Sequence, residues 1–245
     1  MSTAVVTGGS GGIGSAIVRR LAADGTSVVV GYHSAAERAE QLVAELPGTG
    51  HRAARIAVED PGSLDALAAQ LESGPGSLDV LVNCAGVSRP VPHDDLDGLD
   101  DALIDEIFTT NWRGPFALVR VLRPLLDKSG DAVVVNISSV AAVTGQGSNV
   151  AYCASKAALD SMTRSLSRAL APTIRVVSVS PGWVLGEYAS RMPTEVIDAQ
   201  RDATPLGRLA TSDDVAAAVS AVVNDLPFTT GAILPVDGGR PLGTS

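Results

Sequence analysis

Cysteine, lysine and aromatic residues are all scarce in this chain of 245 residues. The two cysteines, Cys84 and Cys153, are too few for a disulfide framework and lack the spacing of metal ligands. No run of 18 apolar residues could cross a bilayer. The first residues enter a strand-like run at once, which leaves no room for a signal peptide. These absences predict a soluble cytoplasmic protein with reduced thiols and no membrane partner.

Basic charge is also in short supply, since the net charge is −9. Proteins that bind nucleic acid or an anionic membrane usually carry basic stripes, so we expect a small-molecule partner and no nucleic acid. The acidic run at 93–98 does not fit a calcium loop, because His93 and Ile104 occupy the first and twelfth positions. We therefore expect no metal.

What the chain does contain is a series of short apolar runs rich in β-branched residues. The runs are continuously apolar, as strands are when helices cover both faces of their sheet. Seven of them are expected to be strands, at 4–6, 27–30, 55–58, 79–82, 132–135, 174–179 and 232–234.

Helical patterns lie between these runs. Apolar residues at positions 13, 17 and 21 form a stripe that stops near Gly25, and positions 64, 67 and 71 do the same after Ser63, a candidate N-cap. Alternating strands and helices predict an α/β fold, a single Rossmann-like domain over 1–245 with a doubly wound parallel sheet of about seven strands. Such sheets bind ligands beyond the carboxyl ends of their strands.

The first strand runs directly into a glycine-rich loop, Thr7-Gly8-Gly9-Ser10-Gly11-Gly12-Ile13-Gly14, and then a helix. Glycines in this place let the backbone approach a pyrophosphate, which the free N–H groups and the helix dipole attract. Gly14 is followed by Ser15 and Ala16, so a P-loop is excluded. A flexible turn is the simpler alternative, but the position between strand and helix favours dinucleotide binding.

The second strand ends in Gly31-Tyr32-His33-Ser34, where this fold reads the adenosine ribose. No carboxylate stands there to repel a 2′-phosphate, which favours NADP(H). Cationic support is limited, because His33 is largely neutral at pH 7 and Arg38 lies well into the next helix. Tyr32 and His33 could instead only cap the sheet.

Tyr152 and Lys156 are four residues apart in a helical pattern and so share one face of the helix. A tyrosine with a pKa of about 10 exchanges protons poorly at pH 7, and a nearby ammonium favours its phenolate. An ordinary solvated helix face would show the same spacing. However, only Lys128 and Lys156 among the 18 basic residues are lysines, which favours a functional role here.

Serine hydroxyls follow the fifth strand at the same edge of the sheet. Ser139 precedes Tyr152 by 13 residues and could donate to a substrate carbonyl oxygen while the tyrosine protonates it. For Ser138 we favour the simpler role of capping the end of the strand.

Together these motifs resemble the short-chain dehydrogenase/reductase family, in its compact type and over the whole chain. The matching features are the glycine loop, Asn111, Ser139, Tyr152 with Lys156, and three further motifs: Asn83-Cys84-Ala85-Gly86, Pro181-Gly182 and Val236-Asp237-Gly238-Gly239.

The resemblance implies an enzyme that reduces a ketone to a secondary alcohol, on a 3-oxoacyl or polyketide-type substrate. Tyr152 is then the general acid, Lys156 holds the nicotinamide ribose, Ser139 polarises the carbonyl, and Asn111 positions a water. An NAD-linked secondary alcohol dehydrogenase and a non-catalytic cofactor-sensing protein are the alternatives. The implied cofactor-binding residues are Gly8, Ser10, Gly12, Ile13, Gly14, Tyr32, His33, Ser34, Val58, Asn83, Ala85, Gly86, Tyr152, Lys156, Pro181, Gly182 and Val184.

Three departures from the family pattern bear on the cofactor site. Cys84 replaces an asparagine and is expected to be a small buried residue without nucleophilic character. Ala57 stands where an aspartate often touches adenine, and Val184 follows Trp183 where a threonine often contacts the nicotinamide amide. A basic residue common in carrier-dependent reductases is missing at 171–173.

The segment 183–210 resembles the family's variable substrate lid, with Tyr188, Arg191 and Met192 available to shape a pocket. The helix that holds Tyr152 continues with an apolar stripe, which in this family packs partly against a second subunit. A homotetramer or homodimer is therefore implied. The stripe consists of Leu159, Met162, Leu166 and Leu170.

Overall fold

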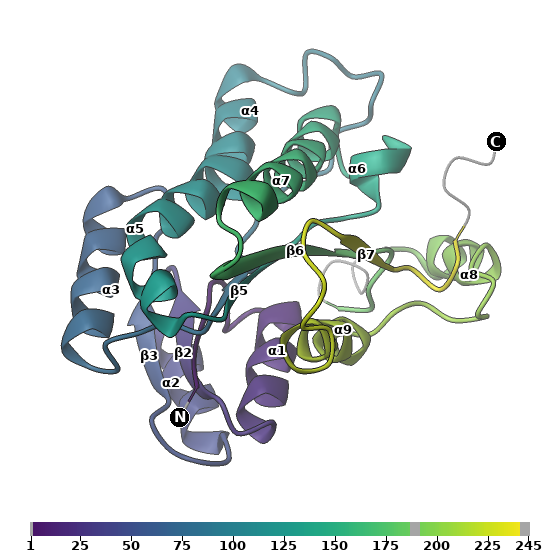
Figure 1. Ribbon diagram of the computed structural model, residues 1–245. Coiled ribbons are helices and arrows are strands. Elements are labelled where there is room, and N and C mark those ends of the chain that lie inside the picture. Colours follow the sequence, from purple (N-terminus) through teal and green to yellow (C-terminus); the bar gives the residue numbers. More distant parts are fainter. Residues whose placement is uncertain (1, 187–191, 241–245) are drawn as a thin grey trace.

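A single parallel sheet of seven strands forms the centre of the computed structural model, which describes residues 2–186 and 192–240 (Figure 1). The strand order is β3-β2-β1-β4-β5-β6-β7, and each neighbouring pair is parallel. This confirms the doubly wound α/β fold. The strands are β1 (Thr3–Val6), β2 (Ser27–Tyr32), β3 (Arg52–Arg55), β4 (Val80–Asn83), β5 (Ala132–Ile137), β6 (Ile174–Pro181) and β7 (Ile233–Val236).

Helices cover both faces of the sheet, which explains why the strands are continuously apolar. Val5 packs toward one layer while its neighbours Ala4 and Val6 pack toward the other. One layer contains α1 (Gly12–Ala23), α2 (Ala36–Glu45) and α9 (Ser212–Asn224). The other contains α3 (Pro61–Ser73), α5 (Gly114–Ser129) and the last turns of α7 (Val150–Ala169) (Figure 1).

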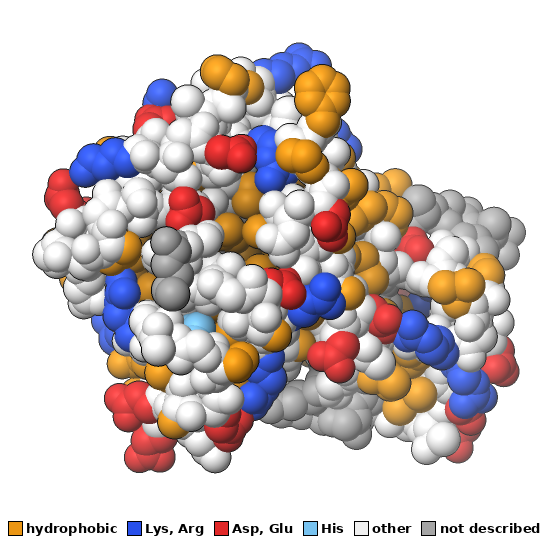
Figure 2. All heavy atoms as spheres, turned by 60° about the horizontal axis from the view of Figure 1, so that its bottom comes forward, with side chains coloured by type: hydrophobic (Ala, Val, Ile, Leu, Met, Phe, Trp, Pro, Cys, Tyr) orange, Lys and Arg blue, Asp and Glu red, His pale blue; other side chains and the backbone are white. Residues whose placement is uncertain are grey.

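Shorter helical segments lie near the carboxyl ends of the strands. Among the described residues, no helix is both long and apolar enough to cross a bilayer. On the face shown in Figure 2, acidic and basic side chains are interspersed, without a large field of one sign. The shorter helical segments are α4 (Asp101–Phe108), the π-helical turn η1 (Thr109–Arg113), α6 (Ala141–Thr144) and α8 (Thr194–Asp202).

The predicted strand at 55–58 is wrong by three residues, because β3 is Arg52–Arg55. β3 is the edge strand, so its side chains need not be apolar on both faces. Ile56, Ala57 and Val58 are buried, but they lie in the turn after the strand. The apolar pattern therefore predicted which residues are buried, but not which residues are hydrogen-bonded in the sheet.

Ser63 is also not the N-cap that the sequence predicted. α3 begins three residues earlier, where the Asp60 side chain accepts the N–H of Gly62 and Pro61 opens the first turn. The hydroxyl of Ser63 instead accepts the N–H of Ala57 at 3.0 Å and so ties the turn after β3 to the helix.

Candidate active site

The glycine loop and the loop after β4 meet where the strand order reverses between β1 and β4. Thr7 Oγ1 accepts the N–H groups of Cys84 and Ala85, each at 3.0 Å. Gly8 has φ of +62°, and a Cβ on it would lie 3.1 Å from Ala85 Cα. Only glycine fits this contact without strain, so the two predicted cofactor loops form one surface.

The N-terminus of α1 fits the phosphates of a dinucleotide. Its N-cap is Gly11, no described side chain caps it, and its first turn contains no acidic residue. A Cβ on Gly14 would lie 2.1 Å from the carbonyl oxygen of Gly8, which explains the glycine there. Gly12, by contrast, has no atom nearer than 4.0 Å on that side, so the backbone around it is open to a ligand. Free N–H groups and the helix dipole favour an anion at this place.

At the end of β2 the structure corrects one premise of the sequence analysis. Tyr32 is half-buried and His33 and Ser34 are exposed beside the glycine loop, as expected. However, the turn after β3 brings Glu59 to His33, and His33 Nε2 lies 2.8 Å from Glu59 Oε1. A carboxylate is therefore present at this corner, although none follows β2 in the sequence.

Lys156 is buried beneath the ring of Tyr152, with only 6% of its surface exposed. Its Nζ donates to the carbonyl oxygen of Ile137 at 2.8 Å and lies 5.8 Å from the centre of the Tyr152 ring. Burial lowers the pKa of Lys156 to about 8, while the nearby Cys84 and Asp160 oppose this shift. The pair thus faces one site, and the ammonium titrates near neutral pH.

Asn111 joins this cluster from η1. Its Oδ1 accepts the N–H of Val87 at 2.9 Å, and its Nδ2 donates to Val87 O and to Ser155 Oγ. A Cβ on Gly86 would lie 3.3 Å from Asn111 Oδ1 and 3.7 Å from Lys156 Nζ. Asn111, Lys156 and Gly86 therefore converge, and the glycine keeps the space between them open.

The hydroxyl groups after β5 lie at the same edge of the sheet. Ser138 is buried, and its Oγ donates to the backbone oxygen of Lys156 at 3.4 Å, so it contacts the helix as well as ending the strand. Ser139 is only partly buried, and its Oγ accepts the N–H of Ala141 at 3.2 Å. Ile137 and Ser138 both contact Lys156, and Ser139 follows them directly in the chain.

The other predicted cofactor residues line the same edge in different ways. Asn83 ends β4, and its buried side chain donates to Asn136 Oδ1 at 2.8 Å. Val58 is buried against Gly114. Gly182 donates its N–H to Val236 O at 3.0 Å, directly after Pro181 at the end of β6.

The segment 183–210 is described only in part. Its ends are joined by a parallel bridge between Val184 and Ala210, and α8 between them contributes no buried residue. Tyr188 and Arg191 lie outside the described residues, while Met192 is partly buried.

Two titratable groups lie near Lys156, the thiol of Cys84 and the carboxyl of Asp160, and burial raises the pKa of both. Burial raises the pKa of Cys84 to about 11, against the opposing charge of Lys156, so the thiol is neutral at pH 7. Asp160 lies one turn after Lys156 and is 3% exposed, and burial raises its pKa. The nearby Ser138 and Ser178 hydroxyls and the charges of Arg164 and Lys156 oppose this rise.

Asn149 is a candidate positioning residue that the sequence analysis missed. It is fully buried and is the N-cap of α7, where its Oδ1 accepts the N–H of Tyr152 at 2.7 Å. Its Nδ2 donates to Arg89 O at 2.8 Å and to Ser88 Oγ at 3.4 Å. Asn149 therefore sets the start of the helix at Tyr152 and joins it to the loop after β4. An asparagine three residues before the tyrosine was the available signal.

We expect Asn149→Ala to lower both stability and turnover. The variant removes the hydrogen bonds of the fully buried Asn149 side chain to the partly buried N–H of Tyr152 and to the carbonyl of Arg89, at a cost of about 2–3 kcal/mol. Chemical denaturation measures the loss, and steady-state rates should show a lower kcat with cofactor affinity within about threefold of the parent. Asn224→Ala is the matched control, because Asn224 is exposed and donates to Asp24 at 3.3 Å. Equal effects of the two variants would contradict the positioning role.

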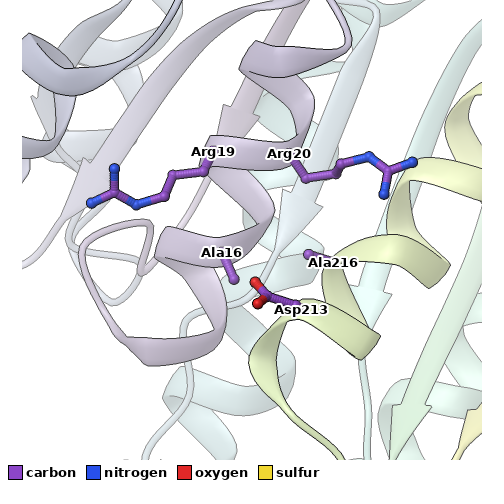
Figure 3. A pocket seen from close by; sticks show the side chains of 5 residues that line it. All are labelled: Ala16, Arg19, Arg20, Asp213 and Ala216. Atoms are coloured by element: carbon purple, nitrogen blue, oxygen red, sulfur yellow. The ribbon is translucent and has the colours of Figure 1, made fainter.

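Two surface hollows lie away from this site. One of about 290 Å³ lies between α1 and α9, lined by Ala16, Arg19, Arg20, Asp213 and Ala216 (Figure 3). Its arginines point away from each other and pair with Glu45 and Asp24, so they are engaged elsewhere. The second hollow, of about 360 Å³, is lined by Trp112, Phe116, Ala158, Ser161, Met162, Ser165 and Leu166.

The residues that gather at the carboxyl ends of β1, β4 and β5 are called the crevice below. The fold and the crevice together define the class of protein, a Rossmann-like enzyme that uses a nicotinamide cofactor. The profile of a family described as Enoyl-(Acyl carrier protein) reductase matches residues 8–240. The chain belongs to the short-chain dehydrogenase/reductase family, and it is an oxidoreductase acting on carbonyl or CH–OH groups.

Relatives with different names cover nearly the whole chain. A protein named as ketoacyl reductase 2 of the granaticin polyketide synthase, from Streptomyces violaceoruber, is 35% identical over 98% of this chain and 96% of its own length. The 3-oxoacyl-(acyl-carrier-protein) reductase FabG of Staphylococcus aureus is 32% identical over 97% of each chain. The cis-4-hydroxycyclohexanecarboxylate dehydrogenase of Sinomonas cyclohexanicum is 37% identical over 96% of this chain and 95% of its own length.

A solved structure agrees with the fold throughout. A short-chain dehydrogenase/reductase from Burkholderia xenovorans superposes with a TM-score of 0.93 at 30% identity, covering 99% of both chains. The fold predicted from the sequence is therefore that of the family.

Proposed function

We propose that this protein reduces a ketone to a secondary alcohol, on a 3-oxoacyl or polyketide-type substrate. The observation that carries the proposal is the convergence of Asn111 and Lys156 on Gly86, with the Lys156 ammonium 5.8 Å from the Tyr152 ring. Two of the relatives are named as ketoacyl or 3-oxoacyl reductases, which supports this class of substrate.

In this proposal Tyr152 is the general acid. Its hydroxyl gives a proton to the carbonyl oxygen of the substrate, and the Ser139 hydroxyl donates a hydrogen bond to the same oxygen. The charge of Lys156 favours the phenolate that remains on Tyr152, and its ammonium also holds the nicotinamide ribose. Asn111 positions a water that returns a proton toward Lys156. When bound, the reduced nicotinamide supplies the hydride that the carbonyl carbon receives.

The residues around the crevice suit a dinucleotide. Backbone groups of the glycine loop would hold the pyrophosphate, because the start of α1 is uncapped by the described side chains. We propose NADP(H) as the preferred cofactor, because no carboxylate directly follows β2 in the sequence to repel a 2′-phosphate. The proposed contacts with the cofactor are Gly8, Ser10, Gly12, Ile13, Gly14, Tyr32, His33, Ser34, Val58, Asn83, Ala85, Gly86, Tyr152, Lys156, Pro181, Gly182 and Val184.

A second candidate is the oxidation of a secondary alcohol with NAD. The relative named cis-4-hydroxycyclohexanecarboxylate dehydrogenase favours it, and so does the presence of Glu59 at the ribose corner. Tyr152 would then be the general base, with the same neighbours.

Segment 183–210 is proposed as the cover of the substrate. The bridge between Val184 and Ala210 anchors both ends, and α8 buries no residue between them. A segment that is held at two ends is suited to closing over a ligand.

We further propose a homodimer or homotetramer formed through the hollow beside α7. Of the predicted stripe, Leu159 and Leu170 are buried within the chain, whereas Met162 and Leu166 line the hollow. The apolar groups that line the hollow include Trp112 and the exposed Phe116, whose rings are stacked 6.0 Å apart. Sedimentation velocity measures the assembly directly, and a monomer at micromolar concentration would contradict the proposal.

The substrate class can be tested with a panel of ketones. We expect 3-oxoacyl thioesters of N-acetylcysteamine to cause oxidation of NADPH or NADH, followed by absorbance of the reduced nicotinamide. The matched control is the saturated acyl thioester, which has no ketone to accept a hydride. If the panel includes cyclic ketones and none is reduced with either cofactor, the proposal is wrong.

A further inference from the structure

His33 and Glu59 form a hydrogen-bonded pair that the proposed reaction does not use. His33 Nε2 lies 2.8 Å from Glu59 Oε1, and the two side chains are 63% and 40% exposed. His33 directly follows β2, and Glu59 lies in the turn after the neighbouring strand β3, 26 residues further along the chain. An exposed pair of this kind contributes little to stability, so its place in the molecule matters more than its strength.

The pair stands at the entrance of the cofactor crevice. Gly9 donates its N–H to Gly31 O at 2.7 Å, and Ile56 donates to Tyr32 O at 2.7 Å. The end of β2 is thus held between the glycine loop and the turn after β3, and His33 follows directly. In this class of fold the end of the second strand is where the 2′ position of the adenosine ribose is read.

The charges at this corner favour an ionised Glu59. Partial burial raises the pKa of Glu59. The hydrogen bonds from its own backbone and from His33, together with the charges of His33 and Arg55, outweigh this effect and hold the pKa below its usual value. Arg55 also lies 3.8 Å from Asp60, which shares its charge. Arg38 is exposed and lies in the first turn of α2, and not well into the helix as the sequence suggested. A carboxylate here repels a 2′-phosphate, and it also binds the imidazole of His33, which could otherwise bind that phosphate. The same carboxylate can accept a hydrogen bond from a 2′-hydroxyl.

We propose that Glu59, through its pairing with His33, is a specificity-determining residue that weakens the binding of the 2′-phosphate of NADP(H) relative to the 2′-hydroxyl of NAD(H). The inference rests on the proposed function, because it requires a nicotinamide nucleotide in this crevice. It predicts that the protein discriminates only modestly between the two cofactors.

Glu59→Gln tests the inference by direct binding. Fluorescence or calorimetric titration of the free protein should show NADPH bound about tenfold more tightly than by the parent, with NADH bound equally or more weakly. The fragments adenosine 2′,5′-bisphosphate and 5′-AMP should show the same change in ratio, since they isolate the ribose corner. Glu45→Gln is the matched control, because Glu45 is similarly exposed and pairs with Arg19 at 2.7 Å on the opposite end of α2.

A second variant tests whether the released imidazole binds the phosphate. Adding His33→Gln to Glu59→Gln should remove most of the gain in NADPH affinity. An unchanged ratio of NADPH to NADH affinity in Glu59→Gln, with both cofactors still bound, would overturn the inference and leave the proposed function intact. Failure of the parent protein to bind either cofactor would instead overturn the proposed function.

Discussion

Replacing Tyr152 with phenylalanine should lower the rate of ketone reduction on the order of 10³-fold. The variant keeps the ring that lies 5.8 Å from Lys156 Nζ and removes only the hydroxyl. General acid catalysis by a positioned side chain typically contributes 10²–10⁴-fold, and no second acid of this kind is proposed here. Single-turnover measurements with saturating cofactor would isolate the chemical step from binding.

The control for this prediction is the binding of the cofactor. Because the hydroxyl acts on the substrate, the dissociation constants of NADPH and NADH should stay within about threefold of the parent. The melting temperature should also change little, since the ring still packs. If Tyr152→Phe keeps activity within a fewfold of the parent, Tyr152 is not the acid and the mechanism is wrong.

Replacing Lys156 with methionine should cost at least about 100-fold in kcat/KM, with weaker binding of the cofactor as well. The ammonium is buried and donates to Ile137 O at 2.8 Å, so methionine preserves volume but removes the charge. The chain offers its own control, because Lys128 is its only other lysine. Lys128 is exposed and lies 3.6 Å from Glu72, so Lys128→Met should change kcat/KM by less than about twofold.

The pH profile adds a second readout for Lys156. Burial lowers its pKa to about 8, so the ammonium form predominates below pH 8 and is lost above it. If the ammonium is required, the kcat/KM for reduction falls as the pH rises through about 8, which rate measurements between pH 6 and 10 would show. If kcat/KM falls at high pH in the same way in Lys156→Met, the group that titrates there is not Lys156.

The sequence predicted most of the architecture because the relevant signals are local. Continuous apolar runs identified six strands to within a few residues, and the stripe after the glycine loop identified α1. The exception is informative. At β3 the apolar residues 56–58 are buried after the strand, so burial and strand pairing occurred at different positions.

The candidate site was predicted in its parts but not in its connections. Tyr152 and Lys156 share a face because they are one helical turn apart, and this is a local property. The hydrogen bonds of Asn149 to Ser88 and Arg89 join segments 60 residues apart, and no spacing in the sequence indicates them.

The sequence by itself thus determined the fold class, the order of the motifs along the sheet edge and the identity of the tyrosine–lysine pair. Only the tertiary structure decided the electrostatics of the site: the burial that lowers the pKa of Lys156, and the carboxylate of Glu59 beside His33. The physical reason is that backbone preferences and apolar periodicity depend on near neighbours in the chain, whereas charge and desolvation depend on which distant segments pack together.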